Sequence, residues 1–196
     1  EFIISDVSEA PFQGLPVTVA LALPDRAVIG EIIPMLSEIG VEKLILFPSA
    51  RSQSSLSKIA SGSERWQRLA IESARQCLRA KPLQIETKTW EDLLQCSDSL
   101  RLCFSEIDFD GKAIEAKNLT PGGEKLGPVL CVFGCEGGWT AEEIAAFKKS
   151  GFSFCHLKIP VMKVATAVTT CLGCLIATFF QDRIKWSIGS LLRVDP

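Results

Sequence analysis

The sequence predicts an α/β fold with a parallel sheet flanked by helices. Short apolar runs of strand length alternate along the chain with longer segments of helical period, which is the pattern of parallel α/β sheets. Hydrophobic residues make up 47% of the 196 residues, enough to bury the core of one sizeable domain. Residues 129–143 contain each part of this pattern in turn: an apolar strand, a glycine loop and the start of a helix.

The expected elements follow from the spacing of apolar residues between turn signals. Strands are expected at residues 17–23, 41–47, 83–87, 100–104, 129–133 and 152–157, and helices at 27–39, 64–80, 90–96, 140–150 and 164–180. Between them, the Ser-rich residues 48–62 are expected to form a mobile loop, and the polar residues 108–127 a surface excursion.

The first expected helix contains a conflicting residue. Ile29, Ile33 and Leu36 recur at helical spacing, but Pro34 removes a hydrogen bond and costs ~3 kcal/mol inside a regular helix. We therefore expect a kink or a restarted helix at Pro34, and a C-terminal cap at Gly40.

The helix expected at residues 64–80 separates apolar from basic residues. Trp66, Ala70 and Ala74 share one face, and the arginines of this segment project elsewhere. Trp66 is therefore expected in the core rather than on the surface as a stacking platform for a base.

The glycine loop, residues 134–138 (GCEGG), is the most distinctive local pattern. Glycine has no Cβ and takes positive φ readily, so a ligand can approach bare backbone here. Thr140 and Glu143 then have the spacing of a capping box, and the free amides at a helix start favour polar or anionic groups. A tight strand-to-helix turn without a ligand would have the same pattern, so both interpretations stay open.

The last expected helix, residues 164–180, is apolar nearly all round. It is shorter than the ~20 residues that a membrane span needs, so no membrane association is predicted. A helix of this kind is buried, either in the core or against a partner subunit.

Charge is unevenly distributed along the chain. The formal net charge of −2 gives no global argument for nucleic-acid binding. Residues 51–88, however, hold eight basic and three acidic residues, a net charge of +5 against −7 for the rest of the chain. This segment could face a polyanion, or it could be an ordinary solvated helix face.

Most of the eight cysteines lie inside apolar strands or helices, where free Cys behaves as a small hydrophobic residue. We therefore expect all eight to be reduced and the protein to be cytoplasmic. Cys171 and Cys174 have C-x-x-C spacing, but His156 is the one histidine that could help them to bind zinc. Residues 1–6 lack the charged region and the cleavage site of a signal peptide.

Six sequence blocks, in order, resemble a known family. They are Glu38-Ile39-Gly40, Ala50-Arg51-Ser52, residues 65–72 (RWQRLAIE), residues 76–79 (QCLR) with Pro82, residues 134–138 and residues 157–167. Together they look like the family that methylates uracil at N3 in small-subunit ribosomal RNA, which is part of the SPOUT class of methyltransferases. The resemblance covers roughly residues 17–180.

The resemblance implies a SPOUT methyltransferase domain over residues 17–186, with a deep trefoil knot in its C-terminal part. Residues 1–16 would be the remnant or linker of a missing N-terminal PUA-like RNA-binding domain, and residues 187–196 a C-terminal tail. It also implies a homodimer that uses S-adenosyl-L-methionine and acts on ribosomal RNA or the small ribosomal subunit.

By the same resemblance, three loops would hold S-adenosylmethionine, mostly on their backbone. The expected cofactor contacts are Phe104, Ser105, Phe133, Gly134, Glu136, Gly137, Gly138, Leu157, Ile159, Met162, Lys163 and Thr166. A side chain at Gly137 is expected to fill the space that the backbone leaves, so that Gly137→Val would abolish cofactor binding.

Methylation at uracil N3 requires the ring imide to lose its proton, so a base or a nearby cation would help. We expect catalytic roles for Lys163, as the cation, and for Glu136, the only acidic residue of the three loops. Glu136 could instead accept backbone amides within its loop. RNA phosphates are expected to contact Arg51, Arg65, Arg75 and Arg79, although each could also be a helix-face charge.

The chain departs from the family pattern at several positions. It has Cys135 where the family usually has Pro, Leu78 where it has Gly, Arg75 where it has Glu, and Pro34-Met35 where it has Gln-Lys. Residues 163–166 (KVAT) replace an Arg-Thr-Glu-Thr run beside the reacting centre. We predict a ribosomal RNA methyltransferase. Two alternatives are a catalytically weakened or inactive RNA- or ribosome-binding member of the same fold, and an unrelated α/β nucleotide-binding enzyme.

Overall fold

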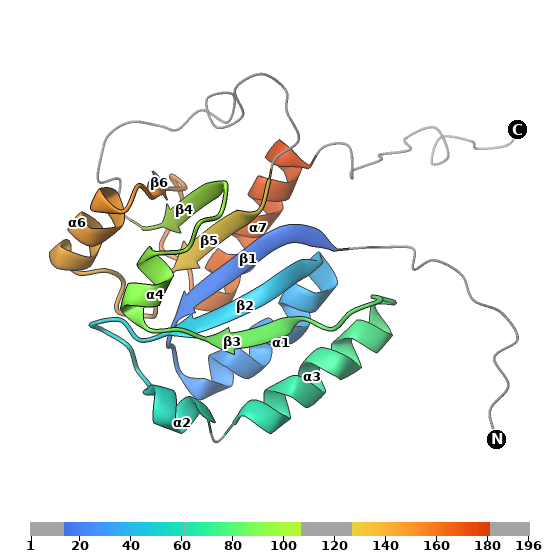
Figure 1. Ribbon diagram of the computed structural model, residues 1–196. Helices are drawn as coiled ribbons and strands as arrows, with labels where there is room; N and C mark the ends of the chain where they lie inside the picture. The colour runs from blue at the N-terminus through green and yellow to red at the C-terminus, as the bar shows by residue number, and fades with distance from the viewer. Residues whose placement is uncertain (1–13, 61, 107–126, 181–196) are drawn as a thin grey trace, which may run out of the picture.

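The computed structural model describes residues 14–60, 62–106 and 127–180, which fold around one parallel sheet (Figure 1). The strands are β1 (Leu15–Ala22), β2 (Val41–Phe47), β3 (Gln84–Thr87), β4 (Leu100–Phe104), β5 (Val129–Phe133) and β6 (Ser153–Cys155). The helices are α1 (Arg26–Ile39), α2 (Leu56–Ala60), α3 (Ser63–Gln76), α4 (Trp90–Leu94), α6 (Ala141–Lys149) and α7 (Val164–Phe179).

The predicted α/β class and parallel sheet are confirmed, because every pair of neighbouring strands is parallel. All the expected strands and helices form, with shifts at their ends. The loop predicted over residues 48–62 is partly wrong, since it contains α2, whose Ile59 is buried in the core. Residues 1–13, 107–126 and 181–196, with the terminal segments and most of the excursion predicted there, lie outside the described residues.

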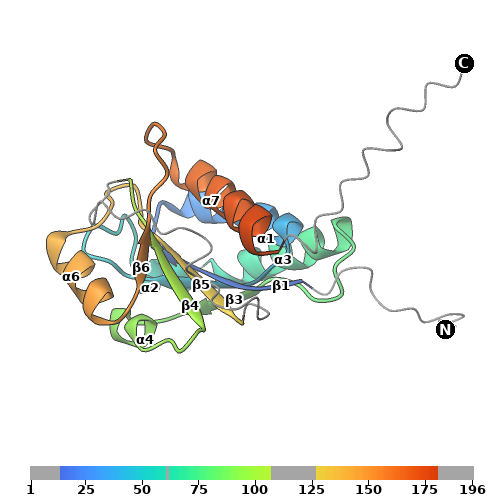
Figure 2. The ribbon, with the colours of Figure 1, turned by 90° about the horizontal axis from the view of Figure 1, so that it is seen from above.

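Two hydrophobic cores lie on the two faces of the sheet, as expected when helices cover both faces of a parallel sheet. Along β1, Val17, Val19 and Leu21 point into one core, and Ala20 and Ala22 into the other, because successive strand residues face opposite sides. Helices α1, α3 and α7 cover the first face, and α4 and α6 contribute to the second core, as Figure 2 shows. Trp66 on α3 is buried in the first core, as predicted.

The strand order, β3-β2-β1-β5-β4-β6, places a topological switch at the centre of the sheet. The chain builds outward from β1 to β3 and then crosses to β4 on the other side of β1. Strand β5 is inserted between β1 and β4, and β6 is added at the edge. In open α/β sheets, ligands bind at such switch points, outside the carboxyl ends of the strands. The carboxyl ends of β4, β5 and β6 are therefore the first place to look for a site.

Helix α1 runs without interruption past Pro34. Of the two predicted outcomes, a kink or a restarted helix, the restart is therefore wrong. The residue four positions earlier, whose carbonyl the proline ring crowds, is Gly30. Ile29, Ile32 and Ile33 are fully buried around this turn, and the packing of these side chains stabilises the helix despite the missing hydrogen bond. Gly40 ends α1 in the left-handed conformation, as predicted.

Helix α3 ends in a Schellman motif with an unusual residue at its left-handed position. The Arg79 amide donates to the Ala74 carbonyl at 2.9 Å and the Leu78 amide to the Arg75 carbonyl at 3.4 Å, which is the bond pattern of this cap. Leu78 has φ +58°, and no other described non-glycine residue has positive φ. Its side chain is 70% exposed, so packing gains little from leucine at this strained position.

Replacing Leu78 by glycine is expected to stabilise the protein. Left-handed backbone costs an L-residue about 1–2 kcal/mol, and the greater entropy of unfolded glycine offsets part of the gain, so we expect a net gain of about 0.5–1 kcal/mol. Thermal unfolding of Leu78→Gly measures it. Leu78→Ala is the matched control, because it removes the exposed side chain but keeps the Cβ. Equal stability of the two variants would contradict the strain argument.

Helix α7 has one buried face and one exposed face. Val168, Cys171 and Leu172 are buried, and the helix packs against α1, so the predicted burial in the core is confirmed for this face. Gly173 and Cys174 are exposed on the other face. Within the described ranges, no helix is both long and apolar enough to cross a membrane. All eight cysteines of the chain are free.

Candidate functional site

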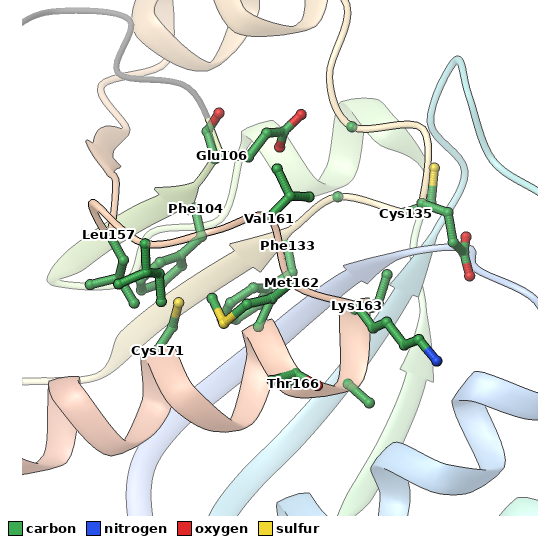
Figure 3. Close-up of a pocket in the computed structure, with 18 of the residues that line it drawn as sticks. Phe104, Glu106, Phe133, Cys135, Leu157, Val161, Met162, Lys163, Thr166 and Cys171 are labelled. Carbon is green, nitrogen blue, oxygen red and sulfur yellow. The ribbon is translucent and has the colours of Figure 1, made fainter.

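A pocket of about 630 Å³ lies at the carboxyl ends of β4, β5 and β6 (Figure 3). Three loops and the start of α7 form most of it, and two residues of α1 complete the lining. Phe104 to Glu106 follow β4, the glycine loop follows β5, and residues 157–163 lead from β6 into the first turn of α7. The three loops expected from the sequence therefore converge on one site, although they are up to about sixty residues apart in the chain.

The inner wall of the pocket is apolar. The Phe104 and Phe133 rings stack with their centroids 4.6 Å apart and their planes 1° from parallel. Leu157 and Met162 add aliphatic surface. The indole Nε1 of Trp139 donates to the Phe104 carbonyl at 3.0 Å, which ties the end of β4 to the glycine loop. A flat apolar group, such as a purine ring, fits a wall of this kind.

Two glycines of the loop provide bare backbone in the pocket wall. Gly138 has φ +64°, and its amide donates to the Cys135 carbonyl at 2.9 Å. A Cβ at Gly138 would lie 2.7 Å from Oε1 of Glu106, and one at Gly134 would lie 3.3 Å from the Trp139 indole. The loop is thus built from residues whose missing side chains leave room for their neighbours and for a ligand.

The expected role of Gly137 is wrong in one respect. Gly137 does not line the pocket, and a Cβ on it would lie 2.9 Å from the Cβ of Arg51. A side chain there would displace Arg51 rather than fill the pocket. Of the three glycines of the loop, Gly134 and Gly138 line the pocket.

The segment after β6 leads to the start of α7. The imidazole Nδ1 of His156 lies 3.2 Å from the Ser105 carbonyl, and the Ser105 amide donates to the Cys155 carbonyl at 3.0 Å, which joins the β4 and β6 loops. Lys163 is the N-cap of α7 without a side-chain capping bond. Because the amides of the first turn have no partner within the helix, this end of α7 favours negative charge at the pocket wall.

Four charged side chains line the pocket: Glu31, Glu106, Glu136 and Lys163. All four are exposed, so each acts on a ligand through partly screened interactions. Oε1 of Glu136 accepts from the Asp25 amide at a long 3.4 Å, and the amide lies outside the glycine loop. Three carboxylates against one ammonium group favour a ligand that carries positive charge.

Three cysteines line the pocket, and two of them, Cys155 and Cys171, are poor nucleophiles. Burial raises the pKa of Cys155 to about 11. Burial, together with Cys174 and Cys155, raises the pKa of Cys171 to about 12. Both thiols stay protonated near neutral pH, and only the thiolate attacks electrophiles efficiently. Cys155 and Cys171 therefore serve as apolar lining of the pocket.

Every expected cofactor residue except Gly137 lines the pocket. Sequence reasoning missed Val28 and Glu31, which come from α1, and also Glu106, Trp139 and several residues in the first turn of α7. Glu106 and Trp139 directly follow expected residues and could have been found by extending the loops. No sequence signal connects α1 with this site.

The four arginines expected to hold RNA do not have equivalent surroundings. Arg65 and Arg75 are exposed on α3. Arg79 donates from Nη1 to the Ser37 carbonyl at 3.1 Å, and burial lowers its pKa although Cys77 and Glu42 raise it. Arg79 therefore caps a carbonyl in the last turn of α1. Arg51 donates from Nη1 to the Gly137 carbonyl at 2.7 Å, beside the pocket.

Within the described residues, no group of three or more His, Cys, Asp or Glu side chains could hold a metal ion.

The sequence profile of the RNA methyltransferase domain family matches residues 11–176. The chain belongs to this family. The matched range contains every described strand of the sheet and every residue that lines the pocket.

The names of similar proteins are consistent with this family membership. The chain is 29% identical over 179 residues to ribosomal RNA small subunit methyltransferase E of Synechocystis, covering 87% of this chain and 56% of the relative. It is 29% identical over 161 residues to the Bacillus subtilis protein of the same name, covering 78% and 63%. The chain thus spans 56% and 63% of the lengths of these two relatives, less than two thirds of each.

Solved structures show the same fold. One is ribosomal RNA small subunit methyltransferase E from Neisseria gonorrhoeae bound to S-adenosyl methionine, with a TM-score of 0.70, 18% identity, and coverage of 89% of this chain and 70% of that one. Another is a putative methyltransferase from Legionella pneumophila with bound cofactor SAM, with a TM-score of 0.69, 22% identity, and coverage of 83% and 66%.

Proposed function

We propose that this chain is an S-adenosylmethionine-dependent methyltransferase that acts on N3 of a uracil in small-subunit ribosomal RNA. The observation that carries the proposal is the convergence of three loops, from the carboxyl ends of β4, β5 and β6, on one pocket. Membership of the RNA methyltransferase domain family and the names of the relatives support the reaction and the substrate.

The pocket fits S-adenosylmethionine in size, shape and charge. Its volume of about 630 Å³ lies within the usual range for ligands of this size. The stacked Phe104 and Phe133 offer an apolar wall for the adenine, and the bare backbone of Gly134 and Gly138 allows close approach. The excess of carboxylates over Lys163 suits a cofactor with a net positive charge.

The residues at the pocket mouth can assist N-methylation. S-adenosylmethionine supplies an electrophilic methyl group on a sulfonium. Uracil N3 must lose its proton to attack, and Glu136, which lines the pocket, would accept that proton directly or through water. Lys163 and the N-terminal amides of α7 stabilise the negative charge that develops on the ring. Positioning of the two reactants supplies much of the remaining rate enhancement.

One observation favours a second function, that of an RNA- or ribosome-binding protein with weakened catalysis. Ala165 lines the pocket in the first turn of α7, at the position where the resembled family has a glutamate. An alanine there can neither accept a proton nor orient a base. Cofactor binding, which uses backbone and apolar surface, would survive this change more readily than turnover.

The same proposal includes a trefoil knot in the fold, a homodimer and a cytoplasmic location. A SPOUT-type trefoil knot is supported by the sequence resemblance, and by the path from β6 at the sheet edge to α7 against α1. A homodimer is supported by the exposed apolar side chains of Ile159 and Val161, and separately by the exposed small residues Gly173 and Cys174 on the outer face of α7. Sedimentation of the protein at micromolar concentration tests the dimer, which a well-folded monomer would contradict. A cytoplasmic location would follow from a ribosomal substrate.

Calorimetry with S-adenosylmethionine, followed by methyl transfer assays on assembled small subunits and on naked ribosomal RNA, tests the function. Mass spectrometry of digested RNA identifies the methylated position. Binding and transfer to uracil N3 are the expected results. Cofactor binding without transfer to either substrate would favour the binding protein, and absence of cofactor binding would exclude the proposed reaction.

The exposed arginines of α3 give a prediction for RNA binding. Each lost phosphate contact lowers the salt slope of the binding constant by about 0.7 to 0.9. Arg65→Ala combined with Arg75→Ala is therefore expected to weaken RNA binding and to reduce the slope by about 1.4 to 1.8, with unchanged S-adenosylmethionine affinity. Arg79 is left unchanged because its bond to the Ser37 carbonyl would confound the result. An unaltered slope would place the RNA elsewhere.

A further inference from the structure

The loop after β2 and the glycine loop after β5 are joined by reciprocal bonds. The Arg51 guanidinium donates from Nη1 to the Gly137 carbonyl at 2.7 Å. In return, the Cys135 thiol donates to the Arg51 carbonyl at 2.9 Å. We call this arrangement, residues 49–51 with residues 135–137, the clasp. It connects segments more than eighty residues apart in the sequence.

The aliphatic part of Arg51 adds packing to these bonds. The space where a Cβ of Gly137 would lie is occupied, since that Cβ would be 2.9 Å from the Cβ and 3.2 Å from the Cδ of Arg51. Gly137 is thus required for Arg51 to lie across the loop. Cys135 is buried beneath it, with its thiol 3.8 Å from the Ser49 hydroxyl.

A buried carboxylate anchors the clasp to α6. Glu143 is 7% exposed, and its Oε1 accepts from the Ala50 amide at 2.7 Å while its Oε2 accepts from the Thr140 amide at 2.9 Å. The same side chain therefore completes the capping box of α6 and holds the residue before Arg51. Hydrogen bonds to a charged acceptor are among the stronger ones in proteins.

We infer that Arg51 is a positioning residue for the cofactor loop, held by Cys135 and Glu143. It touches Gly137, which lies directly between the pocket-lining residues Glu136 and Gly138. By fixing the carbonyl of Gly137, Arg51 restricts the peptide group that joins Gly137 to Gly138, whose amide donates to the Cys135 carbonyl. This role rests on the proposed function and replaces phosphate binding as the main task of Arg51.

Binding of S-adenosylmethionine in the absence of RNA tests the role. Arg51→Met keeps the length of the side chain and removes the donor, so we expect the Kd to rise about 3- to 10-fold, the effect of one partly exposed charged hydrogen bond. Arg51→Lys, which can still donate to the carbonyl, is expected to recover part of the loss. Cys135→Ala should have a smaller effect, because a thiol is a weak donor.

Arg68→Met is the matched control. Arg68 is an exposed arginine of the same basic segment, and its contacts are within α3, to Glu64. This variant is expected to keep the Kd within about twofold of the original value. A comparable loss in Arg68→Met and Arg51→Met would overturn the inference, because it would show a general charge effect. A change in RNA affinity alone in Arg51→Met would overturn it as well.

Hydrogen exchange of the cofactor-free protein gives an independent readout. The Gly138 amide donates within the loop to the Cys135 carbonyl, so it reports on the order of the loop. We expect it to exchange faster in Arg51→Met but not in Arg68→Met, at nearly unchanged melting temperature. Unchanged exchange would overturn the inference. If the original protein binds no cofactor, the proposed function fails, and exchange alone decides on the clasp.

Discussion

Gly138→Val is expected to remove most S-adenosylmethionine binding. The backbone at Gly138 has φ +64°, which a β-branched residue strongly resists. A Cβ there would lie 2.7 Å from Oε1 of Glu106, so the carboxylate must move within the pocket. Overpacking of this kind costs about 1–3 kcal/mol, and we expect the Kd to rise about 10- to 100-fold in calorimetry.

Gly151→Val is the control for backbone strain. Gly151 also has positive φ, +78°, but it lies at the end of α6 outside the pocket. Both variants are expected to unfold at lower temperature, and Gly138→Ala is available if the valine variant does not fold. Only the substitution at Gly138 should weaken the binding of S-adenosylmethionine. Equal affinities of the Gly138 and Gly151 variants would mean that the loop backbone does not form the binding surface.

Gly137 and Gly138 show which features of the glycine loop could be predicted from the sequence and which could not. The GCEGG run predicted a loop with bare backbone, and the capping box at Thr140 and Glu143 is confirmed by both of its hydrogen bonds. Which glycine faces the pocket depends on the side on which Arg51 lies. That side is set by a contact between two loops far apart in the chain, and no local pattern records it.

The same distinction holds for the fold. Strands of alternating or continuous apolar residues were predictable because their period is local, as in β2 and β5, whose bounds match. The short α2 was not, because five residues in a Ser-rich segment have almost no periodicity and depend on the burial of Ile59. Pro34 indicated a break that tertiary packing of α1 overrides.

Glu31 lines the pocket, and this is the clearest feature that the sequence could not reveal. Glu31 lies in the middle of α1, whose spacing identifies an ordinary amphipathic helix. The residue reaches the pocket because α7 packs against α1 and begins beside it. This neighbourhood follows from the strand order, in which the later strands return to the centre of the sheet.

Lys163→Met is expected to slow methyl transfer while RNA affinity stays unchanged. Lys163 lines the pocket at the start of α7, where its charge matters most when uracil N3 becomes anionic. Loss of one preorganised donor in a closed site lowers kcat about 10²- to 10³-fold, and the exposure of Lys163 reduces this to about 10- to 100-fold. Lys158→Met is the control, because Lys158 is an exposed lysine of the same segment that does not line the pocket.

The pH dependence separates charge stabilisation by Lys163 from a structural role. Without the ammonium group, ionisation of N3 depends more on hydroxide, so the rate of Lys163→Met should keep rising with pH after that of the original protein has levelled off. The ratio of the two rates should therefore shrink toward alkaline pH. A ratio that is constant across pH, or a loss confined to KM, would mean that Lys163 only shapes the pocket. In that case the anion would be stabilised by the N-terminal amides of α7 alone.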